Sequence, residues 1–149
     1  DCEDGILVDE KYETSTKNIF AIGDCALNKT EYGVVIESIH HAQFSASRVS
    51  SYILGLQKPK YEEPWFWSDQ FDVKLQIAGL NVGFNRTVTR LGNRPGSEST
   101  WYFKDEKLLA VDAINDGRSF LIAKKLLENK NNPEMSKLED SSFDIKALL

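Results

Sequence analysis

A polar segment that contains two prolines, residues 57–64, divides the chain into two parts with different patterns. Proline cannot continue a helix or donate to a sheet ladder, so such a segment is typical of a linker. The part before it holds two short apolar runs and one long helical pattern. The part after it holds strand-like runs at short intervals. We therefore predict two domains, residues 1–56 and residues 57–149.

The second part predicts an α+β domain with an antiparallel sheet. Strands are expected in its alternating or apolar runs, at residues 74–79, 86–91, 98–104 and 108–114. Residues 105–107 are polar and join the last two runs, so these should form a hairpin, and neighbours with short connections pair antiparallel. A helical pattern follows at 118–128 and is broken by 129–133. The polar stretch after it is expected to pack loosely.

The first part predicts a strand–helix fragment of an α/β domain. Apolar runs at 5–9 and 19–23 predict strands, and the second is apolar throughout, as strands covered on both faces are. A helix of about 18 residues should begin near Ile36 or Glu37 and end at Gly55 as a left-handed cap. Its buried face is predicted from apolar residues at helical spacing, namely Ile39, Ala42, Ala46, Val49 and Ile53. The chain begins without a methionine, so we expect a longer parent protein.

Composition excludes several classes of function. The net charge is -5 and the basic residues are scattered, whereas nucleic-acid binding needs a concentrated positive surface. No apolar run approaches the roughly 20 residues that span a bilayer. Cys2 and Cys25 form neither a CxxC pair nor a set of metal ligands. We expect two reduced thiols in a cytoplasmic protein, and no metal site.

Gly23 and Asp24 carry the candidate chemistry, because an apolar run ends there in Gly-Asp. Ligands of open α/β sheets bind beyond the carboxyl ends of the strands. Glycine allows a ligand to approach the backbone closely, and the aspartate can accept hydrogen bonds from a sugar-like hydroxyl. The alternative is an ordinary turn.

Several separated segments resemble one family, in matching order. Residues 14–26 resemble the second flavin-binding signature of the pyridine-nucleotide-dependent flavoprotein oxidoreductases, and residues 36–42 resemble the helix start beside their flavin. Ferredoxin and rubredoxin reductases have C-terminal domains whose opening, later hairpin and helix are similar to residues 64–70, 74–80, 108–115 and 124–127. One position departs from the family pattern, because Val35 stands where an arginine is common.

The resemblance implies FAD as the cofactor. A helix start offers free N–H groups and a partial positive charge to the flavin ring. Asp24 would bind a ribityl hydroxyl, and Trp67 would lie against the flavin ring. The cofactor-binding residues implied are Gly23, Asp24, Glu37, Ser38, Ile39 and Trp67. The alternatives are an ordinary first helical turn at 37–39 and a domain-interface aromatic at Trp67.

The resemblance also implies a function. The parent protein would pass electrons from NAD(P)H via FAD to a ferredoxin or rubredoxin. This chain has no counterpart of the family's glycine-rich FAD and NAD(P) turns, so another domain would bind NAD(P)H and the isolated chain should be inactive. Two alternatives stay open: a related flavoenzyme with another acceptor, of the monodehydroascorbate or nitrite reductase type, and a non-enzymatic docking or assembly domain.

Five further residues have expected roles. His40 and His41 should lie at the surface or pack, rather than act as acid–base groups. Cys25 should be a small packed residue. Arg86 and Arg90 share one face of a strand, which predicts either a docking face for an acidic ferredoxin or a solvated edge.

Overall fold

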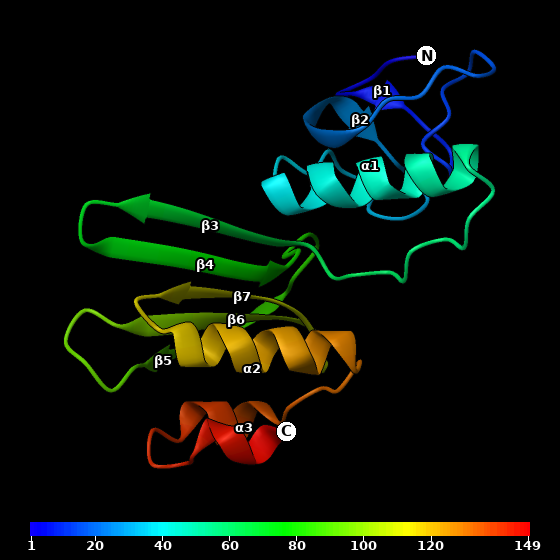
Figure 1. The fold of residues 1–149 in the computed structure, drawn as a ribbon. Helices are drawn as coiled ribbons and strands as arrows, with labels where there is room; N and C mark the ends of the chain where they lie inside the picture. The colour runs from blue at the N-terminus through cyan, green and yellow to red at the C-terminus, as the bar shows by residue number, and fades with distance from the viewer. The chain divides into compact units, whose positions relative to one another are not determined.

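The structure is a computed structural model that describes residues 1–149. It has two compact units, residues 1–61 and residues 62–149. Figure 1 shows the order of the elements along the chain. None of the helices has the length and apolar character needed to cross a membrane.

The second unit contains a five-stranded antiparallel sheet in the order β3-β4-β7-β6-β5. Its strands are β3 (Trp65–Gln70), β4 (Val73–Gly79), β5 (Arg86–Leu91), β6 (Glu98–Lys104) and β7 (Lys107–Ile114). The four predicted strands and the β6–β7 hairpin are confirmed. The sequence pattern missed β3, whose polar second half lacks alternation. It forms an edge strand that pairs with β4 along its whole length.

Helix α2 (Gly117–Glu128) packs on β4 and β7 and covers one face of this sheet (Figure 1). The helix predicted at 118–128 is confirmed. Trp101 and Phe103 of β6 are fully buried in the core beneath it, together with Leu126 of the helix at 1 % exposure. The sheet and the helix thus form two layers with one hydrophobic core between them.

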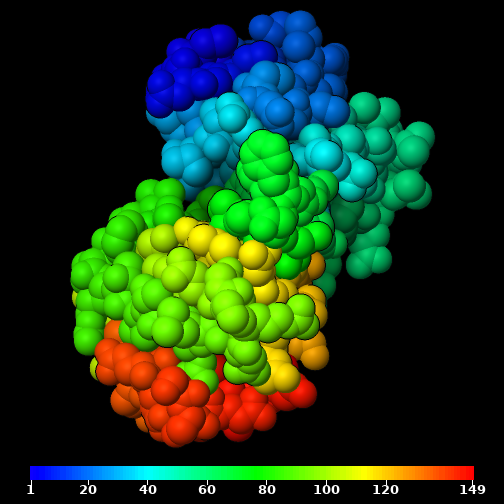
Figure 2. Space-filling model, turned by 90° about the vertical axis from the view of Figure 1, so that its left-hand side faces the viewer, coloured from blue at the N-terminus to red at the C-terminus, as the bar shows by residue number.

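The C-terminal segment packs tightly, so the expectation of loose packing is wrong. It contains α3 (Met135–Glu139) and the short 3₁₀ helix η2 (Ile145–Leu148). Leu138 is fully buried and Ile145 is 5 % exposed, because both join the core of the unit. In Figure 2 the segment, coloured orange-red, lies along one end of this unit. The residues between Leu138 and Ile145 are mostly polar, so the segment gave no continuous periodic signal.

The first unit is smaller and is built around α1 (Ile39–Ile53) and a two-stranded parallel sheet of β1 (Ile6–Leu7) and β2 (Ala26–Leu27). The 3₁₀ helix η1 (Gly23–Cys25) leads directly into β2. With the antiparallel sheet and its helices in the second unit, the predicted α+β class is confirmed.

Residues 19–23 do not form the predicted strand. Their only ladder contact is a single bridge between Phe20 and Glu13. Ile19 and Ile22 are 55 % and 41 % exposed, so the run is not covered on both faces as predicted. A strand needs a partner along its length, and one bridge does not supply it.

Helix α1 begins later than predicted and buries a different face. Ser38 has an extended backbone and caps the helix, so the first helical residue is Ile39. The predicted apolar face is wrong at both ends, since Ile39 and Ile53 are 59 % and 64 % exposed. The buried residues are His41, Phe44, Ser45 and Arg48, which also lie on one face of the helix but are mostly polar.

The end of α1 is as predicted. Gly55 has a φ of +65°, the left-handed conformation that glycine adopts without strain. Its N–H donates to the Tyr52 carbonyl, and the Leu56 N–H donates to the Ser51 carbonyl at 2.8 Å. This pair of bonds is a Schellman motif, which satisfies the last carbonyls of the helix.

Candidate functional site

The Gly23–Asp24 turn is tied to α1. The Gly23 N–H donates to Ser45 Oγ at 3.0 Å, and both residues are buried. Gly23 has a φ of +67°, and a Cβ at this position would lie 3.4 Å from Ala42 Cβ. Asp24 follows it with an exposed side chain. The turn therefore presents a carboxylate to solvent from a backbone that is fixed by the helix.

The segment before α1, residues 36–39, has its own hydrogen bonds. Ile36 is buried at 1 % exposure, whereas Glu37 is exposed. Ser38 Oγ accepts from the His41 N–H at 3.0 Å, so its hydroxyl oxygen serves as the helix cap. The Ile39 N–H, at the first helical position, has no backbone acceptor, as at any helix start. This N–H and the helix dipole are available to a negatively charged or carbonyl-bearing group.

A buried imidazole lies beneath this segment. His41 is 3 % exposed, and its two ring nitrogens lie 3.1 Å from the Ile36 carbonyl oxygen and 3.0 Å from the Tyr12 hydroxyl. A carbonyl can only accept, so Nδ1 carries the proton and Nε2 accepts from the tyrosine. Burial lowers the pKa of His41 below its usual value, and burial raises the pKa of Tyr12 to about 12. Both groups are therefore neutral near pH 7.

A largely buried ion pair lies near the His41 and Tyr12 side chains. Arg48 Nη1 lies 2.6 Å from Glu31 Oε1, and the side chains are 3 % and 17 % exposed. The second terminal nitrogen of Arg48 donates to the Glu10 carbonyl at 2.7 Å. The guanidinium also lies over the ring of Tyr12, 5.6 Å from its centroid. Arg48 therefore connects α1 to two loops that precede it in the sequence, through the ion pair with Glu31 and the hydrogen bond to Glu10.

Sequence reasoning missed this polar network. Its helix members are His41, Ser45 and Arg48, spaced at four and three residues like any buried helix face. Interpretation by hydrophobicity assigns such a polar face to solvent. The preceding segments do contain possible hydrogen-bonding partners for these side chains, namely Tyr12, Gly23 and Glu31. The sequence does not show which partner each helix residue bonds.

Trp67 belongs to the second unit. It lies on β3 opposite Gln76 and is 42 % exposed. Its ring stacks on Trp65, with centroids 5.4 Å apart and planes at 29°. Trp65 in turn packs against Phe120 of α2, and Lys124 lies over its ring. An aromatic pair anchored to the core thus holds one flat ring at the surface.

Two expectations are corrected. Cys25 is not a packed residue, since both cysteines are free and exposed. Arg90 does not lie on a solvated edge, whereas the docking role stays a prediction. Its guanidinium donates to five carbonyls of residues 137, 138, 140, 141 and 143, so it holds the C-terminal segment. Strand periodicity placed Arg90 beside Arg86 correctly but could not show that α3 covers this face.

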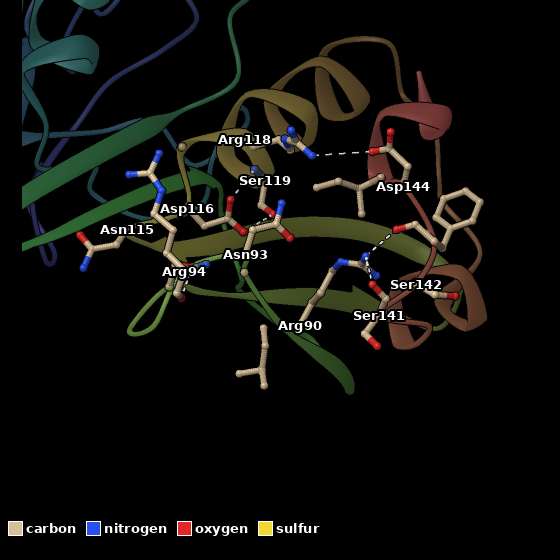
Figure 3. Close-up of a pocket in the computed structure, with 16 residues that line it drawn as sticks. Arg90, Asn93, Arg94, Asn115, Asp116, Arg118, Ser119, Ser141, Ser142 and Asp144 are labelled. Carbon is tan, nitrogen blue, oxygen red and sulfur yellow. Dashed lines mark hydrogen bonds and ion pairs between the residues drawn. The ribbon is translucent and has the colours of Figure 1, made fainter.

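The second unit also has a cavity of about 540 Å³ between the start of α2 and the C-terminal segment (Figure 3). Its arginines are Arg90, Arg94 and Arg118. Arg90 is bonded to the C-terminal carbonyls, and Arg118 faces Asp144 at 3.9 Å. Asp116, on the same wall, caps α2. None of the predicted site residues lines this cavity.

Comparison with known proteins identifies the family. The family described as Reductase C-terminal matches residues 65–149, more than half of the chain. The chain belongs to this family. The family described as pyridine nucleotide-disulphide oxidoreductase matches residues 1–46 of the same reductase chain. The resemblance expected from the separated segments is confirmed.

Individual relatives of this reductase C-terminal chain agree with the family. Rhodocoxin reductase of Rhodococcus erythropolis is 35 % identical over 97 % of this chain and 34 % of its own length. Putidaredoxin reductase of Pseudomonas putida is 30 % identical over 99 % of this chain and 36 % of its own length. The chain thus spans about a third of the length of the curated relatives it matches.

Solved structures give the same result. In a covalent putidaredoxin reductase–putidaredoxin complex, the matching chain has a TM-score of 0.89 at 30 % identity. The match covers 99 % of this chain and 36 % of that one. A ferredoxin reductase from Rhodopseudomonas palustris has a TM-score of 0.86 at 36 % identity, covering 99 % and 37 % of the two chains. The fold of the reductase C-terminal chain is therefore that of the matching third of these reductases.

Proposed function

We propose that this chain forms one wall of the FAD site in a reductase that passes electrons from NAD(P)H via FAD to a ferredoxin- or rubredoxin-type protein. The observation that carries the proposal is the Gly23–Asp24 turn, bonded to α1 through Ser45. In this proposal residues 1–56 belong to the FAD-binding domain, and residues 57–149 form the reductase C-terminal domain.

The residues of the first unit fit such a cofactor. Asp24 offers an exposed carboxylate that can accept from a ribityl hydroxyl. Gly23 keeps this edge free of a side chain, which lets a ligand approach the backbone. The Ile39 N–H needs an acceptor, and a flavin ring carries carbonyl oxygens and ring nitrogens that can accept.

The start of α1 supplies electrostatics as well as a donor. Ser38 and Ile39 contribute mainly their backbone, since the Ser38 hydroxyl oxygen is engaged in capping. A helix N-terminus carries about half a positive charge, which stabilises negative charge nearby. Glu37 is exposed beside it, and we assign it to the flavin-facing segment through its backbone. Trp67 would cover the flavin ring with its own flat face.

Bound FAD supplies the redox chemistry, because it accepts a hydride from NAD(P)H and releases electrons one at a time. The chain's own residues orient the cofactor and exclude water. The NAD(P)H site is assigned to sequence outside the matched third of the relatives. We expect the isolated chain to have no reductase activity.

The names of the relatives support the acceptor class. They include a rubredoxin reductase of Pseudomonas putida and a putidaredoxin reductase, and one related chain was solved with putidaredoxin. We extend this class of small electron-transfer protein to the present reductase. Reduction of monodehydroascorbate or nitrite, with none of a ferredoxin or rubredoxin, would contradict that extension.

Replacement of Asp24 tests the proposal. In a full-length reductase carrying this sequence, Asp24→Ala should weaken FAD binding about tenfold or more, because a charged hydrogen bond contributes roughly 1.5–3 kcal/mol. The measurement is the flavin absorbance that remains bound after gel filtration at several protein concentrations. Asp72→Ala, which removes an exposed carboxylate of the second unit, is the matched control. Equal FAD retention in both variants would overturn the assignment.

A further inference from the structure

The ring of His41 closes a small hydrogen-bonded loop over residues 36–41. Its Nδ1 lies 3.1 Å from the Ile36 carbonyl oxygen, which also accepts from the Ser38 N–H at 3.2 Å. The backbone N–H of His41 donates to Ser38 Oγ at 3.0 Å. One residue in the first turn of α1 thus holds the preceding segment at two points.

From this geometry we propose that His41 is a positioning residue for the flavin edge. It fixes the Ile36 carbonyl, and with it the backbone that leads into the Ile39 N–H. The inference rests on the proposed function, in which that N–H faces the flavin ring. His41 itself acts through Ile36 and is not assigned any contact with the cofactor.

Tyr12 sets the tautomer that this role requires. Its hydroxyl lies 3.0 Å from Nε2 and donates to it, so the proton stays on Nδ1 and can be donated to Ile36. Tyr12 has no exposed surface and is held by the backbone bond from Ala21 N–H to its carbonyl. The Tyr12 hydroxyl, which donates to Nε2, is therefore held in place as firmly as the imidazole.

The packing prevents the imidazole from turning. Tyr32 meets the ring of His41 edge-on, with centroids 5.5 Å apart. The ring of Tyr12 lies 5.9 Å from it on a tilted plane. With 3 % of His41 exposed, water cannot replace the Ile36 bond. Loss of that bond would leave the buried Ile36 carbonyl with only the 3.2 Å bond from the Ser38 N–H, and the segment would be held less firmly.

Three substitutions of His41 distinguish the roles of its two ring nitrogens. His41→Asn places an amide where Nδ1 lies, so it can donate to Ile36 but cannot reach Tyr12. His41→Gln places its amide near the Nε2 position, so it keeps Tyr12 and loses Ile36. His41→Phe keeps the ring shape and loses both bonds.

The readout is the midpoint potential of FAD bound to the full-length reductase, measured by dye-coupled titration at fixed pH. If the helix start moves away, the negative charge of reduced flavin loses stabilisation. We expect His41→Phe and His41→Gln to weaken binding of reduced relative to oxidised FAD about threefold to tenfold, a negative shift of roughly 15–30 mV. His41→Asn should keep the potential of the unchanged protein.

The outcomes distinguish this inference from the proposed function. An unchanged potential in His41→Gln and His41→Phe, or an equal shift in His41→Asn, would overturn the positioning role. If His41→Phe does not fold, the comparison of Asn with Gln still decides. Failure of Asp24→Ala to weaken FAD binding would instead overturn the site itself.

Discussion

The Gly23 N–H donates to Ser45 Oγ across 3.0 Å of buried space, and that hydroxyl in turn donates to the His41 carbonyl at 2.8 Å. A residue two turns inside α1 therefore fixes the turn that carries Asp24. Removing the hydroxyl should release the turn without touching the carboxylate.

We expect Ser45→Ala to destabilise the protein by about 1–3 kcal/mol, because it leaves the Gly23 N–H buried without an acceptor. Urea unfolding followed by circular dichroism measures the loss. Ser47→Ala is the control, since Ser47 lies on the same helix with an exposed side chain. A change above about 0.5 kcal/mol in the control, or none in Ser45→Ala, would contradict the expectation.

Gly79 is expected to tolerate no side chain. Its φ is +78°, and a Cβ would lie 2.2 Å from the Leu109 carbonyl oxygen and 3.0 Å from Leu127 Cδ1. Gly83 has the same φ of +78° but open space around it. Gly83→Ala should therefore cost only the backbone strain, about 1–2 kcal/mol, whereas Gly79→Ala should cost about 4 kcal/mol or more. Similar thermal midpoints for the two variants would show that the clash is absent.

Removing one partner of the Arg48–Glu31 ion pair should strongly lower the free energy of unfolding. Glu31→Gln leaves the buried guanidinium without its counter-charge, for a loss of about 3–5 kcal/mol. Replacing both partners with apolar residues, in Arg48→Met with Glu31→Leu, should recover part of that loss. A double-mutant cycle by urea unfolding measures the coupling. Lys29→Ala, which breaks an exposed pair with Glu3, should change stability by less than about 1 kcal/mol.

Stability should fall as the pH drops below 6.5, the usual pKa of histidine, because His41 has a lowered pKa in the folded protein. Below pH 6.5 the histidine of the unfolded chain binds a proton, whereas the folded His41 stays neutral. The free energy of unfolding therefore decreases as the pH falls from 6.5 to the lower pKa of the folded protein. Burial causes the shift, while Glu31 and Asp24 oppose it and His40 adds to it. Thermal melts between about pH 7.5 and 5 measure the slope, which His41→Asn should reduce. Both proteins retain His40, so the difference between their slopes reports on His41 alone.

Sequence patterns predicted the second unit well because its sheet is built from alternating runs with short polar connections. The strands β4 to β7 and the helix α2 lie where periodicity placed them. β3 was missed, since Trp65 to Trp67 are followed by polar residues and the strand is defined by its pairing with β4. Pairing partners are a tertiary property that local composition does not contain.

The first unit was predicted less well for a related reason. Gly55 gave the correct helix end, because a left-handed cap is a local requirement. The buried face of α1 was wrong, since His41 and Arg48 are buried only through partners in loops 17 to 38 residues away in sequence. Gly23 and Asp24 do lie on a fixed turn, but their role with FAD stays a prediction, as do those of Glu37, Ser38, Ile39 and Trp67.

The bonds of Arg90 set an order of events during synthesis. Its carbonyl partners lie 47 to 53 residues later in the chain, after every strand of the sheet. On the ribosome the strands can therefore pair before the guanidinium meets its acceptors, and the part of β5 that α3 covers would be the last to be buried. Completion of this unit therefore requires residues 137–143, so a nascent chain stalled before them would expose an unfinished surface to chaperones.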